Sequence, residues 1–225
     1  MDFRYIGVAV SVVCCVLTLI THAAFSELRT TAKWILCNLF VALVVGEVLF
    51  VAGIVASAEG DGIDPGLCTA IGIGTHYSLL VAFGWMLMDG LFVFYLFTDV
   101  YAAHRRDETV LFRRYAMSAY GAPLVIVAVT LGVVGPDTAY GGAGHCFLVS
   151  VDGNGAIWAF TGPMAVVLVL NLFMLSRVIR VVYSATVRRR SNLSKTEQEK
   201  LEGRVKLKRA LHASFSFFCR LGLGC

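Results

Sequence analysis

Long uninterrupted runs of apolar residues dominate this sequence and limit what it can fold into. A helix needs about 20 apolar residues to cross a bilayer core. Five runs reach that length, and a sixth stops at the last residue; they cover 5–24, 34–56, 69–100, 115–134, 157–182 and, in part, 211–225. Backbone groups in lipid must bond within their own segment, so each run is expected to be helical. The sequence therefore predicts an all-α polytopic transmembrane helix bundle, with five complete spans and a partial sixth.

The overall composition excludes an ordinary soluble domain. Hydrophobic residues make up 58% of the chain and charged residues only 15%, whereas about a quarter of a soluble domain is charged. The first run has a second interpretation as a cleaved signal peptide, because Arg4 precedes it and Ala23 and Ala24 end it. Its length, and the basic residues Arg29 and Lys33 that follow, favour a membrane span.

Among the loops of the predicted bundle, only alternate ones carry lysine or arginine. The loops after the first, third and fifth runs are basic, and the largest of them is 184–208. The two remaining loops, 57–67 and 135–156, contain no lysine or arginine and carry five acidic residues. The positive-inside rule then places the N-terminus outside the cell and the basic loops in the cytoplasm. A multi-pass protein of the plasma membrane is expected.

The cysteines agree with this topology. Of the seven, only Cys68 and Cys146 fall on the outer, oxidising side, where a disulfide would tie the second outer loop over the bundle. The alternative is a pair of free thiols. The other five lie within apolar runs, where small apolar packing is expected.

Polar side chains inside the runs form a predicted polar network, because burying them in lipid is costly and usually serves a purpose. They are Asn38, Glu47, His76, Asp89 and Asn171. Glu47 has three open interpretations: pairing with His76, pairing with a group on a further helix, or packing in the protonated form. Asp89 is either solvated at the cytoplasmic boundary or part of an interhelical network. No spacing resembles a metal site, a nucleophile with its base or a phosphate loop, so neither catalysis, a cofactor nor a nucleic-acid partner is expected.

The basic loop at 184–208 is the only sizeable polar segment. Ser194 and Glu197 have the spacing of a capping box that opens a charged helix. Its basic residues suit anionic membrane lipid or an acidic partner. They are equally explained as a solvated extension of the neighbouring spans.

Several sequence strings resemble one receptor family in register. The third run reads HYSLLVAFGWMLMDG over 76–90, similar to H-Y/F-x-L-x-x-x-F-x-W-M-L-x-E-G. The fourth contains YGAP at 120–123, and the second outer loop combines YG at 140–141, CFL at 146–148 and WAFTGP at 158–163. These strings resemble the seven-span domain of adhesion-family G-protein-coupled receptors, the secretin-like branch of that superfamily.

The resemblance implies a receptor whose helix bundle passes an extracellular signal to a cytoplasmic heterotrimeric G protein. The ligand, unknown here or a tethered agonist peptide absent from this chain, would contact Phe83, Trp85, Phe147, Trp158 and Phe160. The alternative for each aromatic is core packing or the interfacial belt. The G-protein surface would include His104, Arg105, Arg106, Arg188, Arg189, Arg190, Lys206 and Lys208.

Departures from the family pattern affect the expected mechanism. Leu36 replaces the usual histidine of the second span and Asp89 the usual glutamate of the third, so their usual link cannot form. Phe147 replaces a tryptophan. The last run matches only the start of a sixth span, which is expected of a fragment, a truncated isoform or an incomplete gene model. Two alternatives are a non-signalling chain that associates with full-length relatives, and a transporter or channel subunit with a polar path through Glu47, His76 and Asp89.

Overall fold

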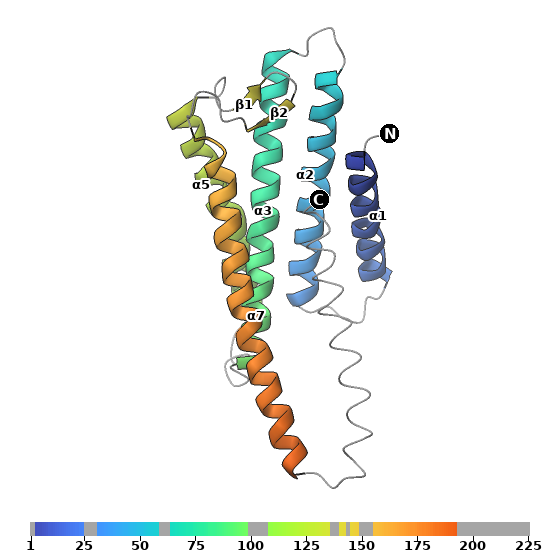
Figure 1. Cartoon of the computed structure of the whole chain (residues 1–225), viewed down its shortest axis with the longest axis vertical. Coiled ribbons are helices and arrows are strands. Elements are labelled where there is room, and N and C mark those ends of the chain that lie inside the picture. Colours follow the sequence, from blue (N-terminus) through green and yellow to red (C-terminus); the bar gives the residue numbers. More distant parts are fainter. Residues whose placement is uncertain are drawn as a thin grey trace.

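Five helices and one β-hairpin make up the described part of the chain (Figure 1). A computed structural model describes residues 3–24, 31–58, 64–98, 108–135, 140–142, 145–148 and 155–192. The elements are α1 (Phe3–Ala24), α2 (Thr31–Ala58), α3 (Pro65–Thr98), α5 (Glu108–Val134), β1 (Tyr140–Gly142), β2 (His145–Leu148) and α7 (Trp158–Asn192).

The helices lie side by side along one axis, with α3 in the middle (Figure 1). Helix α3 contacts α2, α5, α7 and both strands, whereas α1 packs against α2. The hairpin lies across the upper ends of α2 and α3, and the lower end of α7 extends past the other helices. The architecture is that of a partial seven-helix bundle.

Each of the first five apolar runs forms a helix that reaches beyond at least one predicted end. Helix α5 begins at Glu108 rather than at 115, and α7 ends at Asn192 rather than at 182. No glycine or proline interrupts residues 164–192, so nothing in the sequence stops α7 at the membrane boundary. Residues 184–192 of the predicted loop are therefore helical. The predicted capping box at 194–197 and the partial span at 211–225 lie outside the described residues.

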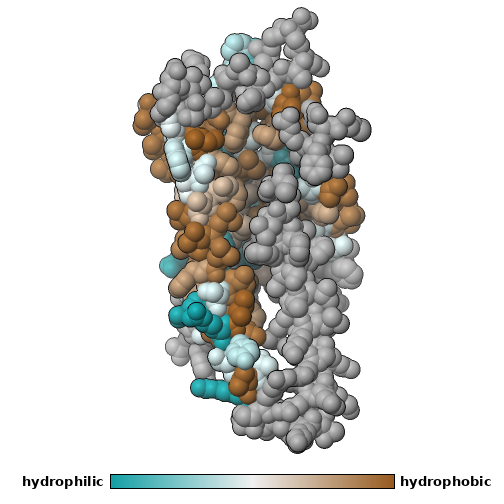
Figure 2. All heavy atoms as spheres, viewed as in Figure 1, coloured by the Kyte–Doolittle hydropathy of each residue, from teal (hydrophilic) through white to brown (hydrophobic). Residues whose placement is uncertain are grey.

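Four of the described helices are long and apolar enough to cross a membrane. The segments are Thr31–Ala56, Pro65–Thr98, Thr109–Val134 and Trp158–Arg188, and α1 contributes a shorter apolar segment, Val10–Thr21. Large apolar side chains remain exposed along their outer faces, and Figure 2 shows this hydrophobic surface along the length of the bundle. Such a surface suits lipid rather than water.

The start of α3 has the sequence of a helix N-terminus. Asp64 precedes the helix, and its carbonyl accepts hydrogen bonds from the amides of Leu67 and Cys68 at 3.0 and 3.1 Å. Pro65 occupies the first helical position, where the missing amide proton costs no bond. This start fixes Cys68 in the first turn of α3, below the outer loop.

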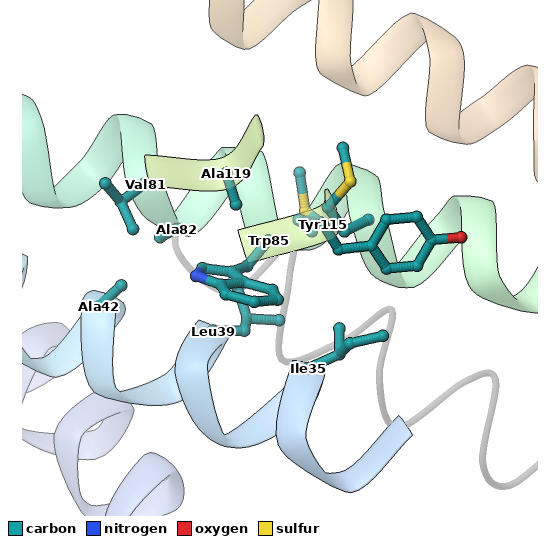
Figure 3. Close-up of a cluster of buried hydrophobic side chains, with 10 residues drawn as sticks. Ile35, Leu39, Ala42, Val81, Ala82, Trp85, Tyr115 and Ala119 are labelled. Carbon is teal, nitrogen blue, oxygen red and sulfur yellow. The ribbon is translucent and has the colours of Figure 1, made fainter. Parts of the chain in front are cut away.

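The main core surrounds Trp85 in the centre of the bundle (Figure 3). The indole is fully buried, and Figure 3 shows it beside Leu39 and Ile35 of α2. Its ring stacks on Phe112 of α5 with the centroids 5.7 Å apart. Burial of one large aromatic between three helices therefore fixes how α2, α3 and α5 approach one another.

A proline and a glycine produce the close approach of α3 and α5. Pro123 lacks an amide proton, so the carbonyl of Ala119 one turn earlier has no donor within α5. Gly84 of α3 faces that carbonyl, and a Cβ atom at this position would lie 2.9 Å from the Ala119 oxygen. The two helices pack backbone to backbone at this level.

Candidate functional site

The β1–β2 hairpin, called the lid hairpin below, is fixed to the bundle by a disulfide. Its antiparallel register pairs Tyr140 with Leu148 and Gly142 with His145. Cys146 of β2 bonds to Cys68 of α3, with their Cα atoms 4.9 Å apart. The predicted pairing of the two outer cysteines is confirmed. It holds one strand of the lid hairpin directly over the first turn of α3.

A buried hydrogen bond joins the lid hairpin to the third helix. The Tyr140 side chain is 1% exposed and His76 is fully buried. The Tyr140 hydroxyl lies 2.8 Å from His76 Nδ1, and burial raises the pKa of Tyr140 to about 12, so the phenol keeps its proton at neutral pH. Among the described residues, His76 Nε2 has no hydrogen-bond partner.

Aromatic rings from four elements gather around Phe160 of α7. Its ring centroid lies 6.1 Å from His76, 6.1 Å from Phe83 and 5.7 Å from Phe147, all in tilted edge geometries. The ring centroids of Phe147 and Phe50 of α2 are 6.0 Å apart, also in an edge-to-face geometry. Edge-to-face pairs at these separations are favourable beyond the area they bury. We call Phe50, His76, Phe83, Tyr140, Phe147 and Phe160 the aromatic cluster.

The structure brings together three of the five predicted ligand-lining residues. Phe83, Phe147 and Phe160 belong to the aromatic cluster. Trp85 lies instead in the core between α2, α3 and α5, and Trp158 is 69% exposed at the outer start of α7. Trp158 therefore has the position of an interfacial belt residue.

Three members of the cluster, Phe50, His76 and Tyr140, were not among the predicted ligand residues, and His76 belonged to the predicted polar network. Phe50 carries no sequence signal, because it is one of many apolar residues in the second run. Tyr140 belongs to the YG string at 140–141 that resembles the family pattern, but its contact with His76 depends on how the lid hairpin folds back onto α3. Long-range loop placement of this kind is not readable from periodicity.

Glu47 is held by the first helix. The carboxylate is 5% exposed, and Ser11 Oγ of α1 donates to Glu47 Oε1 at 2.6 Å. The second oxygen, Oε2, has no hydrogen-bond partner among the described residues. The possible pairing with His76 is not made, since His76 bonds to the lid hairpin instead.

Asn38 links the second helix to α5. Its Oδ1 accepts from the Tyr120 hydroxyl at 2.8 Å, and its Nδ2 donates to the Trp34 carbonyl one turn earlier. The Tyr120 ring also meets Trp85 edge-on at 5.6 Å. Leu36, in the place of the family's histidine, packs on the apolar core. The polar contact at this end of the bundle is therefore between Asn38 and Tyr120.

The last two polar residues lie where α3 meets α7. Asn171 Nδ2 donates to the Val167 carbonyl at 3.0 Å, and its Oδ1 packs against Gly90, beside Asp89. Asn38, Glu47, His76 and Asn171 thus each bond to a residue outside the predicted set. Asn38, Glu47 and His76 make hydrogen bonds between elements, whereas the bond of Asn171 lies within α7.

The predicted cytoplasmic residues are described only in part. Arg188 is exposed near the end of α7, and Arg189 and Arg190 belong to the same helix. The others lie outside the described residues; they are His104, Arg105, Arg106, Lys206 and Lys208. Within the described ranges, no group of three or more His, Cys, Asp or Glu side chains is placed to hold a metal ion.

The membrane-crossing helices and the disulfide-tied lid hairpin fit the architecture of a seven-transmembrane receptor. The family described as 7 transmembrane receptor (Secretin family) matches residues 2–224. The chain belongs to this family and is a multi-pass protein of the plasma membrane.

The curated relatives are adhesion receptors, as the sequence strings indicated. Adhesion G-protein coupled receptor D1 of Bos taurus is 33% identical over 184 residues, which are 80% of this chain and 19% of that protein. Its Homo sapiens counterpart is 32% identical over the same share of this chain and 20% of its own length. Adhesion G protein-coupled receptor D2 of Homo sapiens is 40% identical over 56% of this chain and 12% of its own length. The chain spans about a fifth of the length of the D1 receptors.

Proposed function

We propose that the chain is the membrane part of an adhesion-type G-protein-coupled receptor. It transmits an extracellular signal to a cytoplasmic heterotrimeric G protein by a rearrangement of its helices. The aromatic cluster is the observation that carries this proposal, because one set of touching rings joins α2, α3, α7 and the lid hairpin. His76 lies among these rings and bonds through its Nδ1 to the Tyr140 hydroxyl of the lid hairpin.

The proposed ligand site is the aromatic cluster, with Phe83, Phe147 and Phe160 as its apolar contacts. A ligand with apolar side chains that separated Phe147 from Phe160 would loosen the lid hairpin from α7. It would shift the receptor only through a difference in affinity between the two helix arrangements. Helix α7 contacts α3 again at Gly90, through Asn171 and Met174, so a tilt of α7 at the outer end reaches the inner end.

The proposed G-protein surface is the end of the bundle opposite the lid hairpin. Charge supports this orientation, because Lys33, Arg113 and Arg114 lie near the starts of α2 and α5, and Arg188 lies near the end of α7. Each of the four residues lies near the end of its helix that is opposite the disulfide. The positive-inside rule makes this end cytoplasmic and the N-terminus extracellular.

Nucleotide exchange tests the proposal. The chain in lipid nanodiscs is mixed with purified heterotrimers of each Gα class, and GTPγS binding is measured against empty nanodiscs. We expect exchange above the empty control for at least one class. Phe160→Ala removes the centre of the aromatic cluster with its three ring contacts. It should raise basal exchange by at least about twofold, the effect of losing a single aromatic contact. Phe173→Ala, on an exposed face of the same helix, should leave it unchanged.

A negative result in the nucleotide-exchange measurement would contradict the signalling proposal. If the folded chain accelerates exchange for no Gα class, the signalling function is wrong for this chain. Association with full-length relatives, measured by co-purification, is then the expected activity.

A further inference from the structure

Helix α7 carries a row of arginines at its inner end that the proposed ligand site does not use. Arg177, Arg180, Ser184 and Arg188 are spaced by three, four and four residues, which places them on one helix face. All four are exposed and line one surface depression. The helix contains no aspartate or glutamate over its whole length, so the row is a concentration of positive charge on α7.

The depth of the row matches the inner membrane boundary. Arg177 follows the exposed Trp158 by 19 residues, which is about 28 Å of helix. The hydrocarbon core of a bilayer is about 30 Å thick. With Trp158 in the outer interface, Arg177 and Arg180 lie at the level of the inner headgroups. Arg188 lies two turns further, about 12 Å beyond Arg180.

Large apolar side chains remain exposed among the arginines. Ile179 is 58% exposed, Tyr183 71% and Val187 46%. Figure 2 shows hydrophilic groups gathered at the lower end of the molecule, directly below the hydrophobic surface. A helix that mixes exposed arginines with exposed aliphatic and tyrosine side chains suits the headgroup region, where both kinds of surface are satisfied.

We propose that this arginine row binds an anionic phospholipid of the inner leaflet whose headgroup carries more than one phosphate. Arg177 and Arg180 hold the phosphate nearest the hydrocarbon core, because guanidinium groups bind phosphate oxygens in pairs. Arg188 meets the phosphate that extends furthest into the cytoplasm. The row extends about 16 Å along the helix from Arg177 to Arg188, so a headgroup with several phosphates can contact it at more than one point. The proposal rests on the proposed orientation of the chain but not on G-protein coupling.

Lipid binding to the whole chain tests the proposal without any G protein. Native mass spectrometry of the detergent-solubilised chain is titrated with phosphatidylinositol 4,5-bisphosphate, phosphatidylserine or phosphatidylcholine. The bisphosphate lipid should bind most tightly. Arg177→Gln/Arg180→Gln should weaken it about thirtyfold, since each basic residue near an anionic headgroup contributes about a factor of five to six.

Matched variants separate a local site from net charge and from misfolding. Arg113→Gln/Arg114→Gln removes the same charge from the inner end of α5 and should cost less than about threefold in affinity. Arg177→Lys/Arg180→Lys keeps the charge but loses the planar guanidinium groups that bind two phosphate oxygens at once. Its affinity for the bisphosphate lipid should fall between those of the wild type and the glutamine variant. Helical content and elution volume equal to wild type establish that each variant is folded.

Three outcomes would overturn the proposal. One is phosphatidylserine binding as tightly as the bisphosphate lipid. Another is an equal loss of affinity in the α5 control. The third is unchanged lipid affinity in Arg177→Gln/Arg180→Gln together with lost binding of an acidic G-protein tail peptide, which would assign the row to a protein partner.

Discussion

The hydrogen bond between Tyr140 and His76 is a buried polar contact between the lid hairpin and α3. Both side chains are enclosed, and the lid hairpin covers them from the outer side. A buried polar atom that loses its partner costs its full desolvation. The contact therefore adds one hydroxyl group to the disulfide as a fixed point of the lid hairpin.

Removal of that hydroxyl is the test at the scale of the residue. Tyr140→Phe leaves His76 Nδ1 without its partner and should lower the free energy of unfolding by about 1–3 kcal/mol. The measurement is unfolding of the purified chain in mixed micelles. His76→Phe and the double variant complete a cycle, in which the two single losses should sum to more than the loss in the double variant. Strictly additive losses would show that the contact contributes nothing.

The sequence could identify some site residues and not others for geometric reasons. Phe83 and Trp85 stand in one matching string, but two residues are about 200° apart on a helix, so they face different neighbours. That spacing alone predicts that only one of them reaches the aromatic cluster. The bond between Glu47 and Ser11 joins residues 36 apart in sequence. No local pattern predicts which helix packs beside Glu47.

At the scale of the element, the approach of α3 to α5 depends on a residue without a side chain. A Cβ atom at position 84 would meet backbone atoms of Ala119 at 2.9–3.1 Å. Backbone cannot move aside as a flexible side chain does. The helix pair must separate if this glycine is replaced.

Gly84→Ala should therefore destabilise the chain by about 1–3 kcal/mol, the cost of overpacking. The control is Gly121→Ala on α5, where nothing lies within 4 Å of the added methyl group. That change should be neutral or stabilising by up to about 1 kcal/mol, because alanine favours a helix. Thermal unfolding measured by tryptophan fluorescence compares the two. Equal stability of both variants would contradict the close packing.

The helices themselves are the part of the fold that composition predicts best. Each of the first five apolar runs became a helix because lipid leaves the backbone no alternative. Helix ends were less predictable, since α7 continues to Asn192 through a stretch without glycine or proline, in which Ala185 and three arginines favour a helix. The sequence does not predict the lid hairpin, because its two strands are only three and four residues long and show no alternation of apolar and polar residues.

At the scale of the whole molecule, the disulfide and the basic residues distinguish the same two ends of the bundle. The disulfide and the lid hairpin mark one end, and the basic residues of α2, α5 and α7 mark the other. Between them, α3 touches the other elements of the inner bundle. Helices α3 and α7 contact each other and the lid hairpin, and so connect the two ends of the bundle.

A distance between the inner ends of α3 and α7 tests this central claim most directly. Spin labels on encoded keto amino acids at the exposed positions Thr98 and Tyr183 report that distance by double electron–electron resonance in nanodiscs. Phe160→Ala should change the populations in the distance distribution, because the aromatic cluster sets the tilt of α7. The wild type and Phe173→Ala should give one common distribution. Identical distance distributions in all three proteins would contradict the account, because the aromatic cluster would then not affect the distance between the inner ends of α3 and α7.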